Sequence, residues 1–112
     1  LRLSRGLGDV YKRQAFTVPT GKAHWEILLR ARAIENGAYV IAPAQIGTHN
    51  FSSGGDRKTY GHSMVVDPWG TVLVNATSSV NSLSYFSCDL SKVAAVRSKL
   101  PSLTHDCKYS YE

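Results

Sequence analysis

The sequence has few cysteines, a single methionine and no long hydrophobic run. Its 112 residues include only Cys88, Cys107 and Met64 among the sulfur-containing residues. Two cysteines are too few for the disulfide framework of a small secreted module. The longest apolar stretch runs from Ala38 to Ala44, whereas a membrane-spanning helix needs about 20 such residues. We therefore expect neither a disulfide scaffold nor a membrane partner, and we predict a cytoplasmic protein.

Motifs for nucleotides and metals are missing as well. The sequence contains no glycine-rich phosphate loop, no Walker motif, no Cys-x-x-Cys and no histidine pair at helical spacing. His105 and Cys107 lie two residues apart near the end of the chain, which is a weak pattern for a metal site. We therefore expect no metal site.

What is present is the composition of one small globular domain, with 43% hydrophobic residues and a net charge of +5. Residues 1–14 carry much of that charge. Within them, Ser4 to Gln14 resembles the translation of a sequencing adapter over its whole length. We predict that residues 1–14 are a disordered, adapter-derived scar and that the protein does not bind nucleic acid. The alternative is a small non-catalytic binding module whose basic arm binds nucleic acid.

Apolar spacing predicts the order helix, strand, hairpin, strand, helix, which is a layered α/β fold. The expected elements cover residues 22–36, 38–45, 61–67, 71–75, 82–88 and 90–99. Thr20 and Asp89 are the expected helix caps, and Gly37 is the expected stop of the first helix. Ile27, Leu28, Ala31 and Ile34 form the expected packing face of that helix. Asp67 to Gly70 has the chemistry of a type I turn, and residues 46–60 predict a long loop of the kind that often binds ligands.

Several side chains are chemically capable of catalysis, but each also has a simpler interpretation. His24 stands beside Trp25 and can act as an acid or base in a pocket, or pack at the helix end. His62 and Cys88 are open to the same two interpretations, and a buried structural role is common for cysteine. Glu26 and Glu35 are more simply explained by pairing with nearby arginines, Arg30 and Arg32. Taken alone, these residues do not indicate an enzyme.

Three blocks nevertheless resemble a known family. Residues 15–45 read AFTVPTGKAHWEILLRARAIENGAYVIAPAQ, residues 59–73 read TYGHSMVVDPWGTVL, and residues 97–105 read RSKLPSLTH. Together they resemble the C-terminal half of a carbon–nitrogen hydrolase of the nitrilase superfamily. Residues 24–36 and 60–70 are most similar to the branch that includes deaminated-glutathione amidases. The resemblance assigns residues 15–112 to the C-terminal part of that domain, within a partial four-layer α-β-β-α sandwich.

The resemblance also implies a reaction. Members hydrolyse amides or nitriles with a cysteine nucleophile, a glutamate base and a lysine that stabilises the oxyanion, and they use no cofactor. These residues belong to the family's N-terminal half. Cys88, Cys107 and Lys22 do not match them, so we assign no catalytic residue and expect this chain alone to be inactive. The parent would be a homo-oligomer that acts on a small amide; a nitrilase or an N-carbamoyl-amide hydrolase is the alternative.

The resemblance places one part of the chain near the substrate pocket. It comprises the loop of Ala15, Phe16 and Thr17, followed by His24 and Trp25, and we take Phe16, Thr17, His24 and Trp25 as candidate substrate-binding residues. The pattern differs from the family at residues 50–57, which are longer and richer in glycine and serine, and at residues 106–112. Substrate access can therefore differ in this chain.

Overall fold

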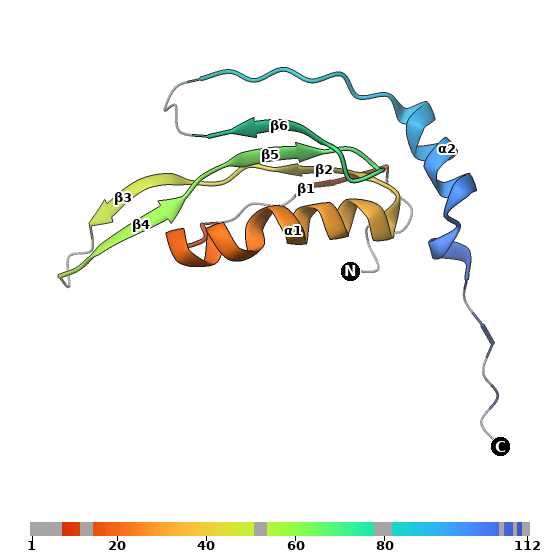
Figure 1. The fold of residues 1–112 in the computed structure, drawn as a ribbon, viewed down its shortest axis with the longest axis horizontal. Coiled ribbons are helices and arrows are strands. Elements are labelled where there is room, and N and C mark those ends of the chain that lie inside the picture. The colour runs from red at the N-terminus through yellow and green to blue at the C-terminus, as the bar shows by residue number, and fades with distance from the viewer. Residues whose placement is uncertain are drawn as a thin grey trace.

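The computed structural model describes residues 8–11, 15–50, 54–77, 82–105, 107, 108 and 110. These residues form two α-helices, six strands and a short 3-10 helix, and the mixed architecture confirms the predicted α/β class. Four strands form one sheet in the order β1-β2-β5-β6, and β3 pairs with β4 in a separate two-stranded sheet. The bounds are β1 Asp9–Tyr11, α1 Val18–Asn36, β2 Tyr39–Ala42, β3 Ile46–Asn50, β4 Asp56–Tyr60, β5 Ser63–Val66, β6 Val72–Ala76, α2 Leu90–Lys99 and the 3-10 helix Ser102–Thr104. Figure 1 shows α1 along the four-stranded sheet, with the β3–β4 hairpin extending beyond the helix start.

Helix α1 begins four residues before the predicted start. Thr17 is its N-cap, so the prediction that Thr20 caps the helix is wrong. Pro19 fits in the first turn, because the N–H that proline lacks has no helical partner there. Gly37 ends the helix as predicted, with φ of 52° and an N–H directed at the carbonyls of Ala33 and Ile34. Glycine adopts this left-handed conformation at little cost.

The buried face of α1 also differs from the prediction. Trp25, Leu29 and Ala33 pack against β2 and β5, whereas Ile27 is 69% exposed. Both sets of residues have helical spacing, so periodicity alone does not show which set meets the sheet. The core on the sheet side consists of Val40, Ala42, Met64 and Val66.

The sheet begins within the segment that we predicted to be disordered. Asp9–Tyr11 pairs in parallel with Tyr39–Ile41, and the carbonyl of Gly8 accepts a hydrogen bond from Tyr39 N at 2.8 Å. The prediction of disorder is therefore wrong for β1, because β2 offers a free edge whose polar groups require partners. The adapter origin stays a prediction, and residues 1–7 and 12–14 lie outside the described residues.

Two further segments differ from their predicted form. Residues 46–60 are not one long loop, because β3 and β4 pair from Ile46↔Tyr60 to Asn50↔Asp56. Their side chains are mostly exposed and polar, so the sequence lacks the alternation that signals a strand. Conversely, residues 82–88 are extended but belong to neither sheet. Their side chains alternate between two faces as in a strand, but a strand of a sheet also needs a hydrogen-bonded neighbouring strand.

The β5–β6 hairpin and α2 agree with the predictions. Gly70 N donates to Asp67 O at 2.9 Å across the turn, which is the closing bond of a β-turn. The Asp89 carboxylate accepts from Ser91 N at 2.9 Å and caps α2, as expected. Val93 and Val96 are the buried residues of this helix.

Candidate functional site

The predicted pocket-wall loop lies between β1 and α1 and is attached to β4. Arg57 donates from Nη2 to the Ala15 carbonyl at 2.7 Å, and Tyr60 N donates to the Phe16 carbonyl at 2.8 Å. Thr17 forms an isolated antiparallel bridge with β4. The β3–β4 hairpin therefore determines where this loop lies, although the sequence predicts a separate loop at residues 46–60.

The structure brings together Phe16 and Trp25 among the four candidate substrate-binding residues. Their rings meet edge to face, with centroids 5.1 Å apart. Trp25 is 2% exposed, and its indole N–H donates to the His62 carbonyl at 2.8 Å. Trp25 therefore supports the loop from the core. His24 is exposed on α1, since adjacent helical residues point in different directions.

An open cleft of about 480 Å³ adjoins this loop. It lies between the first turn of α1 and β4, and its lining residues are Thr17, Val18, Pro19, Asp56, Arg57 and Lys58. Thr17 is the predicted substrate-binding residue that reaches the cleft. The three charged residues from β4 were not anticipated, because their segment carried no strand signal. A concave site with a few polar groups is the usual form of a small-molecule site.

His62 adopts an unusual backbone conformation beside the loop. Its φ is 58°, in the left-handed region that is uncommon for residues other than glycine. The imidazole stacks on Tyr60 with centroids 4.1 Å apart, and its Nδ1 lies 3.0 Å from Asn75 Oδ1. The His62 carbonyl meanwhile receives the bond from Trp25. These contacts link the β4–β5 connection to α1, β4 and β6, which supports the structural interpretation of His62.

A buried carboxylate with several hydrogen bonds lies away from the cleft, at the β5–β6 turn. Asp67 is 1% exposed and accepts hydrogen bonds from Trp69 N, Thr71 N and the Lys92 ammonium. Burial by itself would raise the pKa of Asp67, but the bonds from Lys92, Thr71 and Trp69 together hold that pKa below its ordinary value. The same contact with Asp67 raises the pKa of Lys92. This pair joins the turn to α2 and is structural.

The predicted ion pairs on α1 are present. Glu26 lies 3.5 Å from Arg30, and Arg32 pairs with Glu35. All four side chains are about half exposed, so each pair contributes little to stability. Arg30 also donates from Nε to the Gly70 carbonyl at 2.9 Å. These residues hold the helix surface and the turn in place.

Candidate nucleophiles and metal ligands do not gather in the described part of the chain. Cys88 and Cys107 are both exposed free thiols. No group of three or more His, Cys, Asp or Glu side chains is placed to hold a metal ion among the residues that the structure describes. In the same residues, no helix has the length and apolar character to cross a membrane.

Comparison with known proteins identifies the family. The model of the carbon-nitrogen hydrolase family matches residues 5–98. The chain belongs to the carbon-nitrogen hydrolase family. This carbon-nitrogen hydrolase chain is 52% identical over 97 residues to a protein of Schizosaccharomyces pombe described as "Probable hydrolase nit2". It is 46% identical over 104 residues to the "Deaminated glutathione amidase" of Synechocystis.

The matches cover most of this carbon-nitrogen hydrolase chain and about a third of each relative. They span 85% of the chain and 34% of the yeast protein, and 92% of the chain and 36% of the Synechocystis protein. Among solved structures, the NitFhit protein of Caenorhabditis elegans matches with a TM-score of 0.77 at 44% identity, over 93% of this chain and 25% of that protein. The structural likeness therefore extends over most of this chain and over a quarter of that protein.

Proposed function

We propose that this chain is the C-terminal part of an amidase that hydrolyses the carbon–nitrogen bond of a small linear amide. The observation that carries the proposal is the family match over residues 5–98, together with relatives described as deaminated glutathione amidases. Deaminated glutathione is accordingly the substrate to test first. A nitrile or an N-carbamoyl amide is the alternative substrate class.

In this proposal the chain supplies binding and support, and the rest of the parent supplies the reacting groups. A glutamate takes the proton of the cysteine thiol, and the resulting thiolate attacks the amide carbon while a lysine stabilises the oxyanion. The glutamic acid then gives that proton to the departing amine. Water then attacks the thioester, which releases the acid and restores the thiol. The position of the described thiols supports this division, because Cys88 and Cys107 are exposed and outside the cleft.

The exposed face of α1 supports a homo-oligomeric parent. Ile27, Leu28 and Ile34 are apolar and more than two-fifths exposed on one helix. Apolar residues grouped on a surface are characteristic of protein–protein contacts. We propose that this face lies in the subunit interface of a cytoplasmic enzyme.

A chimera tests the proposed function. In the Synechocystis relative, the part of the matching segment that corresponds to residue 15 onwards is replaced by the residues of this chain, which leaves out residues 1–14; the match is 46% identical over 104 residues. We expect the chimera to hydrolyse deaminated glutathione and the isolated chain to show no turnover. The unaltered relative is the positive control, and circular dichroism checks that the chimera folds.

Three outcomes would contradict the proposal. A folded chimera without amidase activity would show that these residues do not serve that reaction. Turnover of a nitrile or carbamoyl amide in place of the amide would favour the alternative class. Turnover by the isolated chain that disappears in Cys88→Ala would show that a residue of this chain is the nucleophile.

A further inference from the structure

Strand β4 holds the Ala15–Thr17 loop at each of its three residues. Arg57 donates from its guanidinium to the first carbonyl at 2.7 Å. The backbone N–H of Tyr60 donates to the second carbonyl at 2.8 Å. Thr59 forms an isolated antiparallel bridge with the third residue. The loop is therefore fixed along its length by a strand that is distant in sequence.

The other side of this loop rests on the core. The Phe16 ring packs edge-on against Trp25, and the Trp25 indole is itself held by the His62 carbonyl. Buried Trp25 provides a rigid base, since it is 2% exposed and its polar atom has a partner. The hairpin side is the more accessible side, because Arg57 reaches Ala15 across the surface.

Among the β4 contacts, the one from Arg57 is made by a side chain. It can be removed without changing the backbone pairing of β3 with β4. Its guanidinium carries a full charge, so its hydrogen bond to a carbonyl is stronger than a neutral one. Arg57 also lines the cleft together with Thr17. The residue thus connects the position of the loop with the shape of the cleft.

We propose that Arg57 is a positioning residue for substrate binding. By holding the Ala15 carbonyl, it keeps the loop and its last residue, Thr17, in place as part of the cleft wall before substrate arrives. A wall that is already ordered loses less conformational freedom on binding, which strengthens binding. This inference rests on the proposed function, because it assigns the cleft to the amide substrate. It predicts an effect on KM more than on kcat, since the wall contacts substrate away from the reacting bond.

The first experiment measures amide hydrogen exchange in the full chain and does not require the chain to be catalytically active. Amide hydrogen exchange of residues 15–17 is compared in Arg57→Gln and Arg30→Gln. Arg30 is a matched control, because it also donates from a guanidinium to a backbone carbonyl, that of Gly70 at 2.9 Å. We expect exchange in the loop to be at least about threefold faster in Arg57→Gln and unchanged in Arg30→Gln. Unchanged exchange in Arg57→Gln would overturn the inference.

The second experiment measures kinetics in the chimera with deaminated glutathione. We expect Arg57→Gln to raise KM about fivefold to tenfold with kcat within about twofold, and Arg30→Gln to leave KM unchanged. The KM increase should persist at 0.5 M NaCl, because salt screens a direct charge contact with substrate far more than a backbone hydrogen bond. Circular dichroism of each variant checks that it is folded.

The outcomes separate this inference from the proposed function. Faster exchange with an unchanged KM would show that the loop does not bind substrate, which overturns the positioning role. A KM effect that vanishes at high salt would mean that Arg57 attracts substrate directly, which also overturns it. If the chimera with Arg57 intact is folded but inactive, the proposed function is wrong, and the role of Arg57 in substrate binding is wrong with it. Hydrogen exchange still tests whether Arg57 orders the Ala15–Thr17 loop.

Discussion

At the residue scale, the most consequential polar side chain is Asp67. It is almost completely buried and accepts bonds from two backbone N–H groups and from Lys92. The backbone bonds shape the β5–β6 turn, and the bond from Lys92 attaches that turn to α2. One carboxylate thus organises both a turn and the packing of a helix, and its removal leaves two backbone N–H groups and the Lys92 ammonium without this acceptor.

We expect Asp67→Ala to lower the free energy of unfolding by about 2–3 kcal/mol, because several hydrogen bonds to one buried charged group are lost. Asp67→Asn should cost less, since an amide oxygen can still accept the two backbone bonds. Urea unfolding of the full chain measures both. The exposed Asp56 provides the control, and Asp56→Ala should change stability by less than about 0.5 kcal/mol. Equal effects at the two positions would contradict the role of Asp67.

The same carboxylate makes stability depend on pH. Because the pKa of Asp67 is lower in the folded chain than in the unfolded chain, its contribution is fully present above the unfolded value of about 3.9. It is lost as the pH falls through the folded pKa. In Asp67→Asn, the decline in stability below about pH 4 should therefore be shallower than in the wild type. If the free energy of unfolding falls equally steeply below about pH 4 in both proteins, this linkage is excluded.

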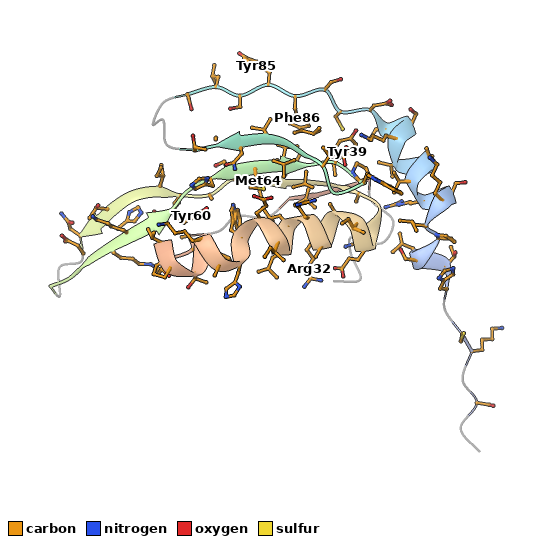
Figure 2. The ribbon with its side chains drawn as sticks, in the orientation of Figure 1. Arg32, Tyr39, Tyr60, Met64, Tyr85 and Phe86 are labelled. Atoms are coloured by element: carbon orange, nitrogen blue, oxygen red, sulfur yellow. The ribbon has the colours of Figure 1, made fainter. Side chains whose placement is uncertain are left out.

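At the element scale, α1 meets β4 at its first turn. A Cβ added at Gly21 would lie 2.3–2.4 Å from atoms of Tyr60, so only glycine fits the present packing. The hairpin that carries Tyr60 also holds the loop before α1. Figure 1 shows β4 passing the start of α1, and Figure 2 shows Tyr60 there. The position of the hairpin, and with it the cleft, depends on this close approach.

We expect Gly21→Ala to destabilise the chain by about 1–3 kcal/mol, because α1 and β4 must move apart. The change acts against helix propensity, which favours alanine over glycine by about 1 kcal/mol. Lys22→Ala, at an exposed neighbouring position, is the control and should stay within about 0.5 kcal/mol of the wild type. Thermal or urea unfolding distinguishes the two. If Gly21→Ala stabilises the chain, Tyr60 can move away from residue 21 at little cost in free energy.

At the scale of the whole molecule, an extended segment lies outside both sheets. Residues 83–88 belong to neither sheet, and Leu83 and Tyr85 are 83% and 84% exposed. Figure 1 shows this segment running beside β6 towards α2. An extended segment that lies outside a sheet and exposes apolar side chains favours pairing with another chain.

We therefore expect the isolated chain to self-associate as its concentration rises. Replacing both Leu83 and Tyr85 with serine should shift the weight-average mass towards that of a monomer in sedimentation velocity. Ile27→Ser changes the exposed face of α1 and serves as the comparison. If Ile27→Ser abolishes association and the double variant does not, the helix face makes the contact instead of the extended segment.

Local chemistry in the sequence determined the features that depend on neighbouring residues. The Asp67–Gly70 turn, the Gly37 stop, the Asp89 cap, the mixed class and the α1 ion pairs all follow from short-range rules. The resemblance carried by residues 15–45 also indicated the family, which the comparisons confirmed. None of these features depends on which helix or strand packs against which.

Tertiary structure decided the features that depend on distant residues. It chose the Trp25 face of α1 over the Ile27 face, paired β1 with β2, and turned residues 46–60 into a hairpin. It also placed Arg57 against the loop and so formed the cleft. Periodicity identifies an apolar stripe but not its partner, and exposed polar strands leave no periodic signal. Hydrogen bonds from Arg57 and Tyr60 to residues more than 40 positions earlier fixed the Ala15–Thr17 loop, because backbone polar groups need partners.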